Sequence, residues 1–251
     1  MIGLLIIGDE ILSAQIQEKN LKYMLRNLAI SGYKVSEARI IGDDKALIAK
    51  TVYDMSATYQ YVITSGGVGP THDDITLESI ALAFRCSLQT NTKLESILKH
   101  YFKDHITDEI LSMARLPDSA EAIFKNDAEW PIIKMKNCFI LPGVPQVFQK
   151  KFDHVLQLLP RVEKYYYASL YLNEDESKFA KELTEFQHSH PSTIVGSYPV
   201  IDEPEYKTQI TLKSKEKVNL ASGYEELKRF FSSKKWLFKS VEPSFYIPDE
   251  T

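Results

Sequence analysis

The chain of 251 residues is 44% apolar and 25% charged, the composition of an ordinary soluble globular protein with enough apolar residues for a substantial core. Its formal net charge of −4 argues against a general affinity for nucleic acid or acidic membranes, so a phosphorylated ligand would have to meet local or imported positive charge. Two cysteines, Cys86 and Cys138, are too few for a disulfide scaffold and are expected to be reduced core residues.

The N-terminus predicts a buried strand and no membrane span. Leu4 to Ile7 form a continuous apolar run that ends at Gly8, as expected for a strand that is covered on both faces. The run is too short to cross a bilayer, and no basic leader precedes it. We therefore expect a cytoplasmic protein without a membrane segment.

Helices and strands alternate along the next part of the chain. From Glu18 to Leu28 the apolar positions fall at i, i+3, i+4 and i+7, which indicates a helix, and Ser31 and Gly32 close it. The same criteria predict a strand at 35–41, a helix through 45–55, a strand at 59–64 and a helix at 75–84.

Further helices and short strands are predicted up to Pro160. The region 91–115 is expected to form one or two polar helices, with the segment "DEILSMARLP" ending at Pro117. Short strands are expected at 122–124 and 132–135. The segment "CFILPGVPQVFQKKF" then predicts a buried strand, a Pro-Gly turn and a helix, since Pro145 is tolerated in a first helical turn.

This order predicts an α/β fold for residues 1–160, with a mostly parallel sheet and helices on both of its faces. A strand, a helix, two strands and a helix follow, which predicts a small α+β C-terminal domain at 161–233. Residues 234–251 carry two prolines and an acidic end and are expected to be a partly extended or loosely held tail. Ligands of mostly parallel sheets bind beyond the carboxyl ends of the strands.

The segment "SGGVGPTHDDIT", residues 65–76, follows such a strand end. Glycines between a strand and a helix let backbone N–H groups approach an oxyanion closely, and the helix N-terminus adds partial positive charge. An alternative is a tight turn that Thr71 or Asp73 caps, and spacing alone favours neither. The candidate phosphate-binding residues are those of this loop and of the Pro-Gly turn, namely Ser65, Gly66, Gly67, Gly69, Thr71 and Gly143.

The two aspartates of the loop favour a divalent cation. Asp73 and Asp74 would repel a bound phosphate unless a cation bridged them, and Mg²⁺ is commonly held by one or two carboxylates together with substrate phosphates. Asp9 and Glu10 follow the first strand and are candidate metal ligands beside Asp74 at the same end of the sheet. Asp74, Asp73 and His72 are the candidate catalytic residues, with His72 either a proton donor to a leaving phosphate or a surface turn histidine.

Four pieces of the sequence carry a family resemblance. They are "GDEIL" at 8–12, Asn20, the loop "SGGVGPTHDDIT", and "LPGVP" at 141–145. Together they resemble the molybdopterin-binding superfamily of the Mog, MoaB and CinA type over roughly residues 2–158. The loop looks most like that of the N-terminal molybdopterin-binding-like domain of eukaryotic FAD synthases, and "GSYP" at 196–199 is similar to the segment that follows that domain.

The resemblance implies a ligand and a chemistry. In Mog-like members the loop glycines, here Gly66, Gly67 and Gly69, and the second aspartate, here Asp74, serve pterin phosphate and Mg²⁺ binding. In the CinA and FAD-synthase branches the domain is associated with metal-dependent hydrolysis of the pyrophosphate of FAD or ADP-ribose. The adenylyl-transferring domain of the synthases is not in this sequence, so the resemblance implies that the chain does not make FAD. It also implies a homo-oligomer.

Two departures from the family pattern leave three hypotheses open. Ala14 and Glu18-Lys19-Asn20 replace the usual glycine and Asp-Thr-Asn, and "NDAEWPIIKMKNC" replaces a Gly/Pro-rich loop. The first hypothesis is a divalent-metal-dependent pyrophosphatase of FAD-like or ADP-ribose-like dinucleotides, with water as the nucleophile. The alternatives are molybdopterin binding or adenylylation, and a catalytically inert binding or regulatory module.

Overall fold

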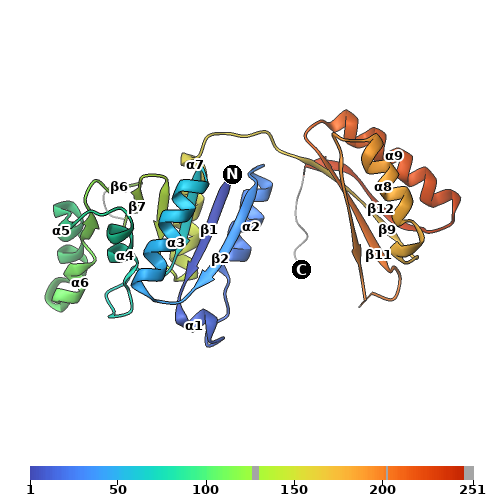
Figure 1. The fold of residues 1–251 in the computed structure, drawn as a ribbon. Helices are drawn as coiled ribbons and strands as arrows, with labels where there is room; N and C mark the ends of the chain where they lie inside the picture. The colour runs from blue at the N-terminus through green and yellow to red at the C-terminus, as the bar shows by residue number, and fades with distance from the viewer. Residues whose placement is uncertain (126–129, 202, 246–251) are drawn as a thin grey trace. The chain divides into compact units, whose positions relative to one another are not determined.

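The computed structural model describes residues 1–125, 130–201 and 203–245, and the chain forms two compact units (Figure 1). Residues 1–29 and 33–161 make up the first unit, and residues 30–32 together with the chain from 162 onward make up the second. None of the helices in the described ranges combines the length and the apolar character needed to cross a membrane.

The first unit is built on a six-stranded sheet with the strand order β2-β1-β3-β8-β7-β6. Its strands are β1 (Ile2–Ile7), β2 (Val35–Ile41), β3 (Tyr61–Ser65), β6 (Glu121–Ile123), β7 (Ile132–Met135) and β8 (Cys138–Leu141). The first four in spatial order run parallel, whereas β7 and β6 are antiparallel to their neighbours. The predicted α/β fold with a mostly parallel sheet is therefore confirmed.

Helices cover both faces of this sheet, and β1 shows why its sequence is apolar throughout. One face is covered by α2 (Asn20–Ile30) and α7 (Pro145–Leu158), and the other by α3 (Lys45–Thr58) and α4 (Thr76–Ala83). Side chains alternate along a strand, so Leu4 and Ile6 pack with α2 and α7, while Leu5 and Ile7 pack with α3 and α4. All six residues of β1 are buried as a result.

The starts of these helices follow signals in the sequence. Asp44 caps α3, because its Oδ1 accepts a hydrogen bond of 2.7 Å from the N–H of Leu47. Pro145 is the first residue of α7, as predicted, where its missing N–H costs no hydrogen bond. A short helix α1 (Asp9–Leu12) follows β1 directly and carries two acidic residues in its turn.

The region between α4 and β6 differs from the prediction. It contains α5 (Thr92–Phe102), the 3₁₀ turn η1 (Lys103–His105), α6 (Asp108–Ser112), and a small antiparallel sheet of β4 (Leu88–Thr90) and β5 (Arg115–Pro117). The helix predicted to run to Pro117 ends at Ser112 instead. Ala114 and Leu116 are buried in the core, and the Ala114 carbonyl accepts a hydrogen bond of 2.8 Å from the N–H of Asn91, so tertiary pairing replaces the last helical turn.

The second unit is a four-stranded antiparallel sheet with two helices packed against it. Its elements are β9 (Tyr166–Leu172), η2 (Glu176–Lys178), α8 (Ala180–Ser189), β10 (Ile194–Pro199), β11 (Thr208–Ser214), α9 (Lys217–Ser233) and β12 (Leu237–Phe245). The strand order is β10-β11-β9-β12, and the aromatic residues Phe179, Tyr224 and Phe231 are fully buried in its core.

Residues 237–245, which the sequence placed in a tail beyond residue 233, form β12 and pair with β9. Trp236 and Leu237 pack partly buried against the core of the second unit, which anchors the strand. Residues 246–251 lie outside the described ranges, so the prediction for the acidic end stays a prediction.

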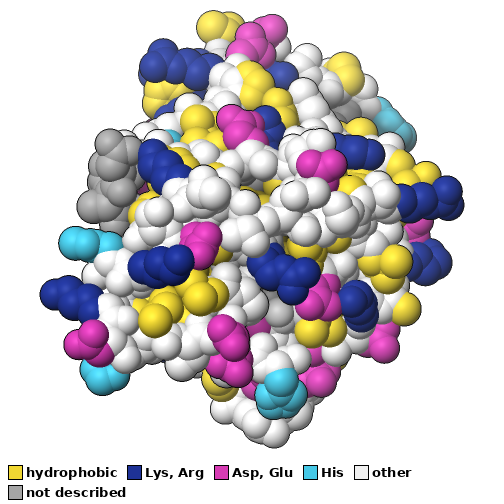
Figure 2. All heavy atoms as spheres, turned by 90° about the vertical axis from the view of Figure 1, so that its left-hand side faces the viewer, with side chains coloured by type: hydrophobic (Ala, Val, Ile, Leu, Met, Phe, Trp, Pro, Cys, Tyr) yellow, Lys and Arg dark blue, Asp and Glu magenta, His cyan; other side chains and the backbone are white. Residues whose placement is uncertain are grey.

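The cysteines are reduced, as expected from their number, and the surface charge is mixed in sign. Both cysteines are free thiols, and burial raises the pKa of Cys138 to about 11, whereas Cys86 is partly exposed. On the face drawn in Figure 2, acidic and basic side chains of the described residues are interspersed, and neither sign forms a continuous field there.

Candidate functional site

A cavity of about 590 Å³ opens at the carboxyl ends of β1, β3 and β8. Its walls come from the segments 6–11, 16–20, 65–74 and 142–147, with Met113 and Trp130 added from outside the parallel strands. A volume of this size suits a nucleotide or another small cofactor. The cavity lies where the strand order predicted a ligand.

The loop after β3 forms one wall of the cavity and holds three backbone donors without an acceptor. Its ends are fixed: the N–H of Gly66 donates to the Leu141 carbonyl at 3.1 Å, and the N–H of Thr76 donates to the Gly67 carbonyl at 3.0 Å. Between them, the N–H groups of residues 67–69 donate no hydrogen bond to any residue in the described ranges. Three consecutive free N–H groups beside a cavity are suited to bind an oxyanion.

Asp74 lies in the cavity wall and is held by the loop itself. Its Oδ2 accepts hydrogen bonds from the N–H of Thr71 at 2.9 Å and from Thr71 Oγ1 at 2.5 Å. A Cβ added at Gly69 would lie 2.6 Å from the same oxygen, so glycine is needed there for the carboxylate to approach the loop. Within the described residues Asp74 forms no salt bridge, and its Oδ1 remains available to a ligand.

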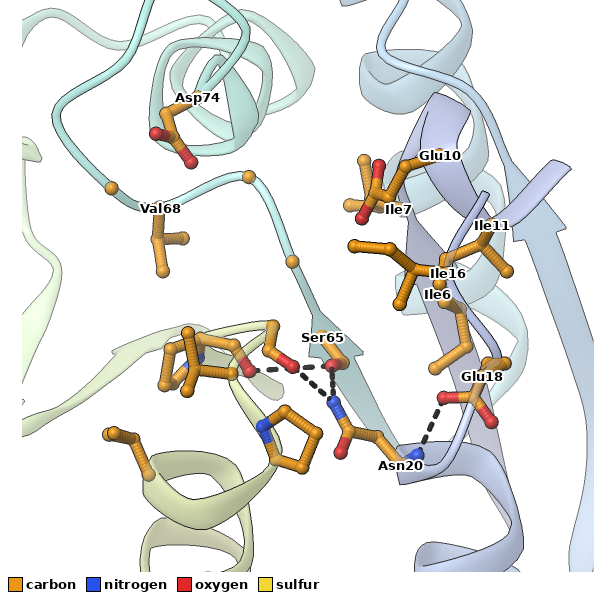
Figure 3. A pocket seen from close by; sticks show the side chains of 18 of the residues that line it. Ile6, Ile7, Glu10, Ile11, Ile16, Glu18, Asn20, Ser65, Val68 and Asp74 are labelled. Atoms are coloured by element: carbon orange, nitrogen blue, oxygen red, sulfur yellow. Dashed lines mark hydrogen bonds between the residues drawn. The ribbon is translucent and has the colours of Figure 1, made fainter. Parts of the chain in front are cut away.

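Glu10 also lines the cavity, whereas Asp9 does not. Figure 3 shows the Glu10 and Asp74 carboxylates on opposite sides of the glycine loop. Asp9 turns toward the β2–α3 connection, where its Oδ1 accepts from the N–H of Asp43 at 3.3 Å and its own N–H donates to Asp43 Oδ2 at 2.8 Å. Burial raises the pKa of Asp43, and the charges of Asp9, Glu10 and Asp73 raise it further.

The other predicted site residues divide into two groups. Ser65, Gly66, Gly67, Gly69 and Gly143 line the cavity together with Glu10 and Asp74. Thr71, His72 and Asp73 are exposed and do not line it. Thr71 acts on the cavity by holding Asp74.

Asn20 joins the strand ends that build the site, a role that its place in the sequence did not reveal. Its side chain is buried, and Nδ2 donates to Ser65 Oγ at 3.0 Å and to the Gly143 carbonyl at 2.7 Å (Figure 3). The Glu18 carboxylate closes the start of α2 by accepting from the N–H groups of Asn20 at 2.7 Å and Leu21 at 2.9 Å. Lys19 is then the one basic side chain among the described residues that line the cavity.

Replacing Asn20 by alanine is expected to lower the free energy of unfolding by about 1–2 kcal/mol, because one buried and one part-buried acceptor lose their donor. The loss is moderated because Asn20 Oδ1 is itself buried without a partner among the described residues, and the substitution removes it. Urea unfolding measures the change. Asn27→Ala is the matched control on the same helix, since Asn27 Nδ2 donates to the Tyr23 carbonyl one turn earlier, and an equal loss in both variants would contradict a bridging role for Asn20.

The donor set fits a cation that takes few protein ligands. Among the described residues, His, Cys, Asp and Glu form no group of three or more that could hold a metal ion by itself. Three carboxylates of the described part of the chain line the cavity, and Glu18 is hydrogen-bonded to N–H groups at the start of α2. Asp74 and Glu10 are the other two. Mg²⁺ commonly uses one or two carboxylates and completes its shell with substrate phosphates and water, so the residues present fit that ion.

Comparison with known proteins assigns each unit a counterpart. A family model described as "Probable molybdopterin binding domain" matches residues 3–164, and one described as "FAD synthase, middle domain" matches residues 164–239. A probable FAD synthase from Caenorhabditis elegans is 28% identical over 94% of this chain and 52% of its own length, so the chain spans about half of that relative.

Two further matches cover nearly all of the other protein. A protein from Archaeoglobus fulgidus is 30% identical over 88% of this chain and 95% of its own length. The crystal structure of CinA from Thermoplasma acidophilum, described as a protein of unknown function, is 26% identical over 62% of this chain and 96% of that chain, with a TM-score of 0.56. The shared fold is thus that of the first unit.

Proposed function

The chain belongs to the family of probable molybdopterin-binding domains, and from this premise we propose that its cavity binds the diphosphate of an FAD-like or ADP-ribose-like dinucleotide and hydrolyses it with the help of a divalent cation. The observation that carries the proposal is the pairing of three free backbone N–H groups, at residues 67–69, with the carboxylates of Asp74 and Glu10 in one cavity.

The pairing makes physical sense for a phosphorylated ligand with a cation. The free N–H groups attract a phosphate oxyanion, whereas Asp74 and Glu10 repel it, and a site with both would bind a diphosphate weakly by itself. A divalent cation such as Mg²⁺, held by Asp74 and completed by phosphate oxygens and water, would supply charge neutralisation and polarisation of the phosphoryl group.

The chain's own residues would bind and orient the ligand. The N–H groups of residues 67–69 would hold one phosphate and stabilise the negative charge that develops on it during hydrolysis. Lys19 also lines the cavity and would contact the second phosphate as a point charge. The isoleucine side chains of the segment 6–16 and Val144 offer apolar surface to the remainder of the ligand.

The proposed reaction is a hydrolysis that balances without any other co-reactant. The oxygen of a water molecule bonds to one phosphorus and its protons pass to solvent, the bond from that phosphorus to the bridging oxygen breaks, and the second phosphate leaves with the bridging oxygen. FAD would give FMN and AMP, and ADP-ribose would give AMP and ribose 5-phosphate. The similarity to a probable FAD synthase supports a nucleotide of this class as ligand.

Removal of the cation is expected to abolish this activity. The purified chain is incubated with FAD or ADP-ribose and Mg²⁺, and FMN or AMP is measured by chromatography, with and without EDTA. Product that forms with Mg²⁺ and falls by at least about 100-fold with EDTA supports the proposal, since a bound cation contributes several kcal/mol to such a step. Equal product with EDTA would exclude the metal requirement.

Absence of product from both dinucleotides would overturn the proposed hydrolysis. Calorimetry with a pterin phosphate then separates the two remaining functions. Binding of the pterin would favour a role in molybdopterin binding, and the lack of binding to all three ligands would favour an inert or regulatory module. Self-association and a cytoplasmic location stay predictions that sedimentation and fractionation can measure.

A further inference from the structure

The cavity contains one aromatic side chain among the described residues that line it, Trp130. The rest of its apolar lining is aliphatic, with isoleucine, valine and proline side chains from the segments 6–16 and 142–147. Aliphatic side chains provide contact area for any apolar group. An indole adds a flat π-face, which favours another flat aromatic ring over an aliphatic group of equal size.

Three features hold the backbone at Trp130 in place. Pro131 follows it and restricts its backbone to extended conformations. The next residue, Ile132, is buried at the start of β7, which fixes the chain immediately after the tryptophan. Lys151 of α7 is itself buried, and its Nζ donates a hydrogen bond to the Trp130 carbonyl.

The indole is partly buried and packs against the hydrophobic cluster on the α3 and α4 side of the sheet, while it also lines the cavity. Part of the side chain is therefore fixed by the core and part remains available to a ligand. A preorganised ring of this kind loses little conformational entropy when another ring stacks on it.

We propose that Trp130 is a specificity-determining residue that stacks on the flat heteroaromatic ring of the nucleotide ligand. The site would then recognise two chemical features: phosphate oxygens at the N–H groups of residues 67–69 and a fused heteroaromatic ring, such as a flavin, pterin or purine, at Trp130. The inference rests on the proposed function for the phosphate part of the ligand and adds the ring part. Trp130, just before β7, would recognise the ring through its side chain.

The test compares ligands with and without a ring in the wild-type chain, Trp130→Phe and Trp130→Leu. Binding is measured by calorimetry in the presence of Mg²⁺ with FMN and AMP, which have no diphosphate to hydrolyse, and with methylenediphosphonate, a diphosphate mimic that has no ring. Trp130→Leu is expected to bind FMN and AMP about tenfold more weakly, because it loses a stacking contact, while its affinity for methylenediphosphonate stays within about twofold. Trp130→Phe keeps an aromatic face and is expected to lose less than Trp130→Leu.

A second readout uses the small number of tryptophans. The chain has two, Trp130 and Trp236, and Trp236 belongs to the second unit. In a Trp236→Phe background Trp130 is the sole indole, and AMP should change its emission, whereas methylenediphosphonate should not. The indole is excited at the long-wavelength edge of its absorption band, where AMP does not absorb, and AMP does not absorb the emission either, so a change reports an altered environment of the ring.

The outcomes separate this inference from the proposed hydrolysis. Ring-dependent binding that weakens in Trp130→Leu, without any turnover of FAD or ADP-ribose, would keep the inference and remove the hydrolase. Hydrolysis whose KM is the same in Trp130→Leu and the wild type would remove the inference about Trp130 and keep the hydrolase. If Trp130→Leu fails to fold, as judged by circular dichroism, Trp130→Phe and the emission change decide, and an unchanged emission with saturating AMP would overturn the proposal.

Discussion

Replacing Gly66 by alanine is expected to lower the free energy of unfolding of the first unit by about 3 kcal/mol or more. Gly66 has a φ of +111°, a conformation that residues with a Cβ rarely adopt. An alanine Cβ at this position would lie 2.1 Å from the Ile7 carbonyl oxygen of the neighbouring strand. Because that oxygen belongs to the backbone of the central sheet, it cannot move aside without shifting β1.

Gly143→Ala is the matched control for this substitution, because Gly143 also lines the cavity. Its φ is not in the left-handed region, and an added Cβ would meet Gly66 Cα at 3.4 Å, an ordinary contact. Urea unfolding of the two variants is expected to give a loss below about 1 kcal/mol for Gly143→Ala, as for a substitution without strain. Equal losses would contradict the claim that the backbone of Gly66 specifically requires glycine.

The Gly66 result would explain why the loop could be located from the sequence. Glycines at 66 and 67 with positive φ are needed for the chain to leave β3 and turn into α4 beside β1, and the sequence contains that requirement as a local pattern. The signal for the parallel strands is equally local, since a continuous apolar run such as Leu4 to Ile7 indicates a strand buried on both faces, whichever strands it pairs with. This is why the fold of the first unit was predictable.

Elements whose structure depends on a distant partner were not predictable in the same way. Arg115–Pro117 follows a helical pattern but pairs with Leu88–Thr90, a contact that periodicity cannot contain. Leu237–Phe245 contains a proline and looks like a tail, yet it pairs with β9, with two register shifts. In both cases tertiary pairing decides the backbone, and local propensity does not.

The site shows the same limit at the level of single side chains. Asp9 and Glu10 are adjacent, as are Asp73 and Asp74, so the sequence places each pair at the right end of the sheet without telling its members apart. The hydrogen bonds of Asp9 with Asp43 and of Asp74 with Thr71 turn the side chains in different directions. Glu10 and Asp74 are thereby placed in the cavity wall.

This difference between adjacent aspartates leads to the prediction with the largest effect on activity. Asp74→Asn is expected to lower kcat for FAD or ADP-ribose hydrolysis by at least about 100-fold, which corresponds to about 2.7 kcal/mol of lost transition-state stabilisation. Asparagine has the same shape, and its Oδ1 can still accept the hydrogen bonds from Thr71, so the loop should keep its conformation. The substitution therefore removes the charge and little else.

Asp73→Asn is the control, because it removes the same charge one residue earlier, from an exposed side chain outside the cavity wall. Its rate is expected to stay within about threefold of the wild type, since a charge in solvent is screened from the ligand. Rates measured over a range of Mg²⁺ concentrations add a second criterion: Asp74→Asn should need more Mg²⁺ for half-maximal rate, and Asp73→Asn should not. Equal losses in the two variants would show that the net charge of the loop matters and the position of the carboxylate does not, and the assignment of Asp74 as a cation ligand would then fall.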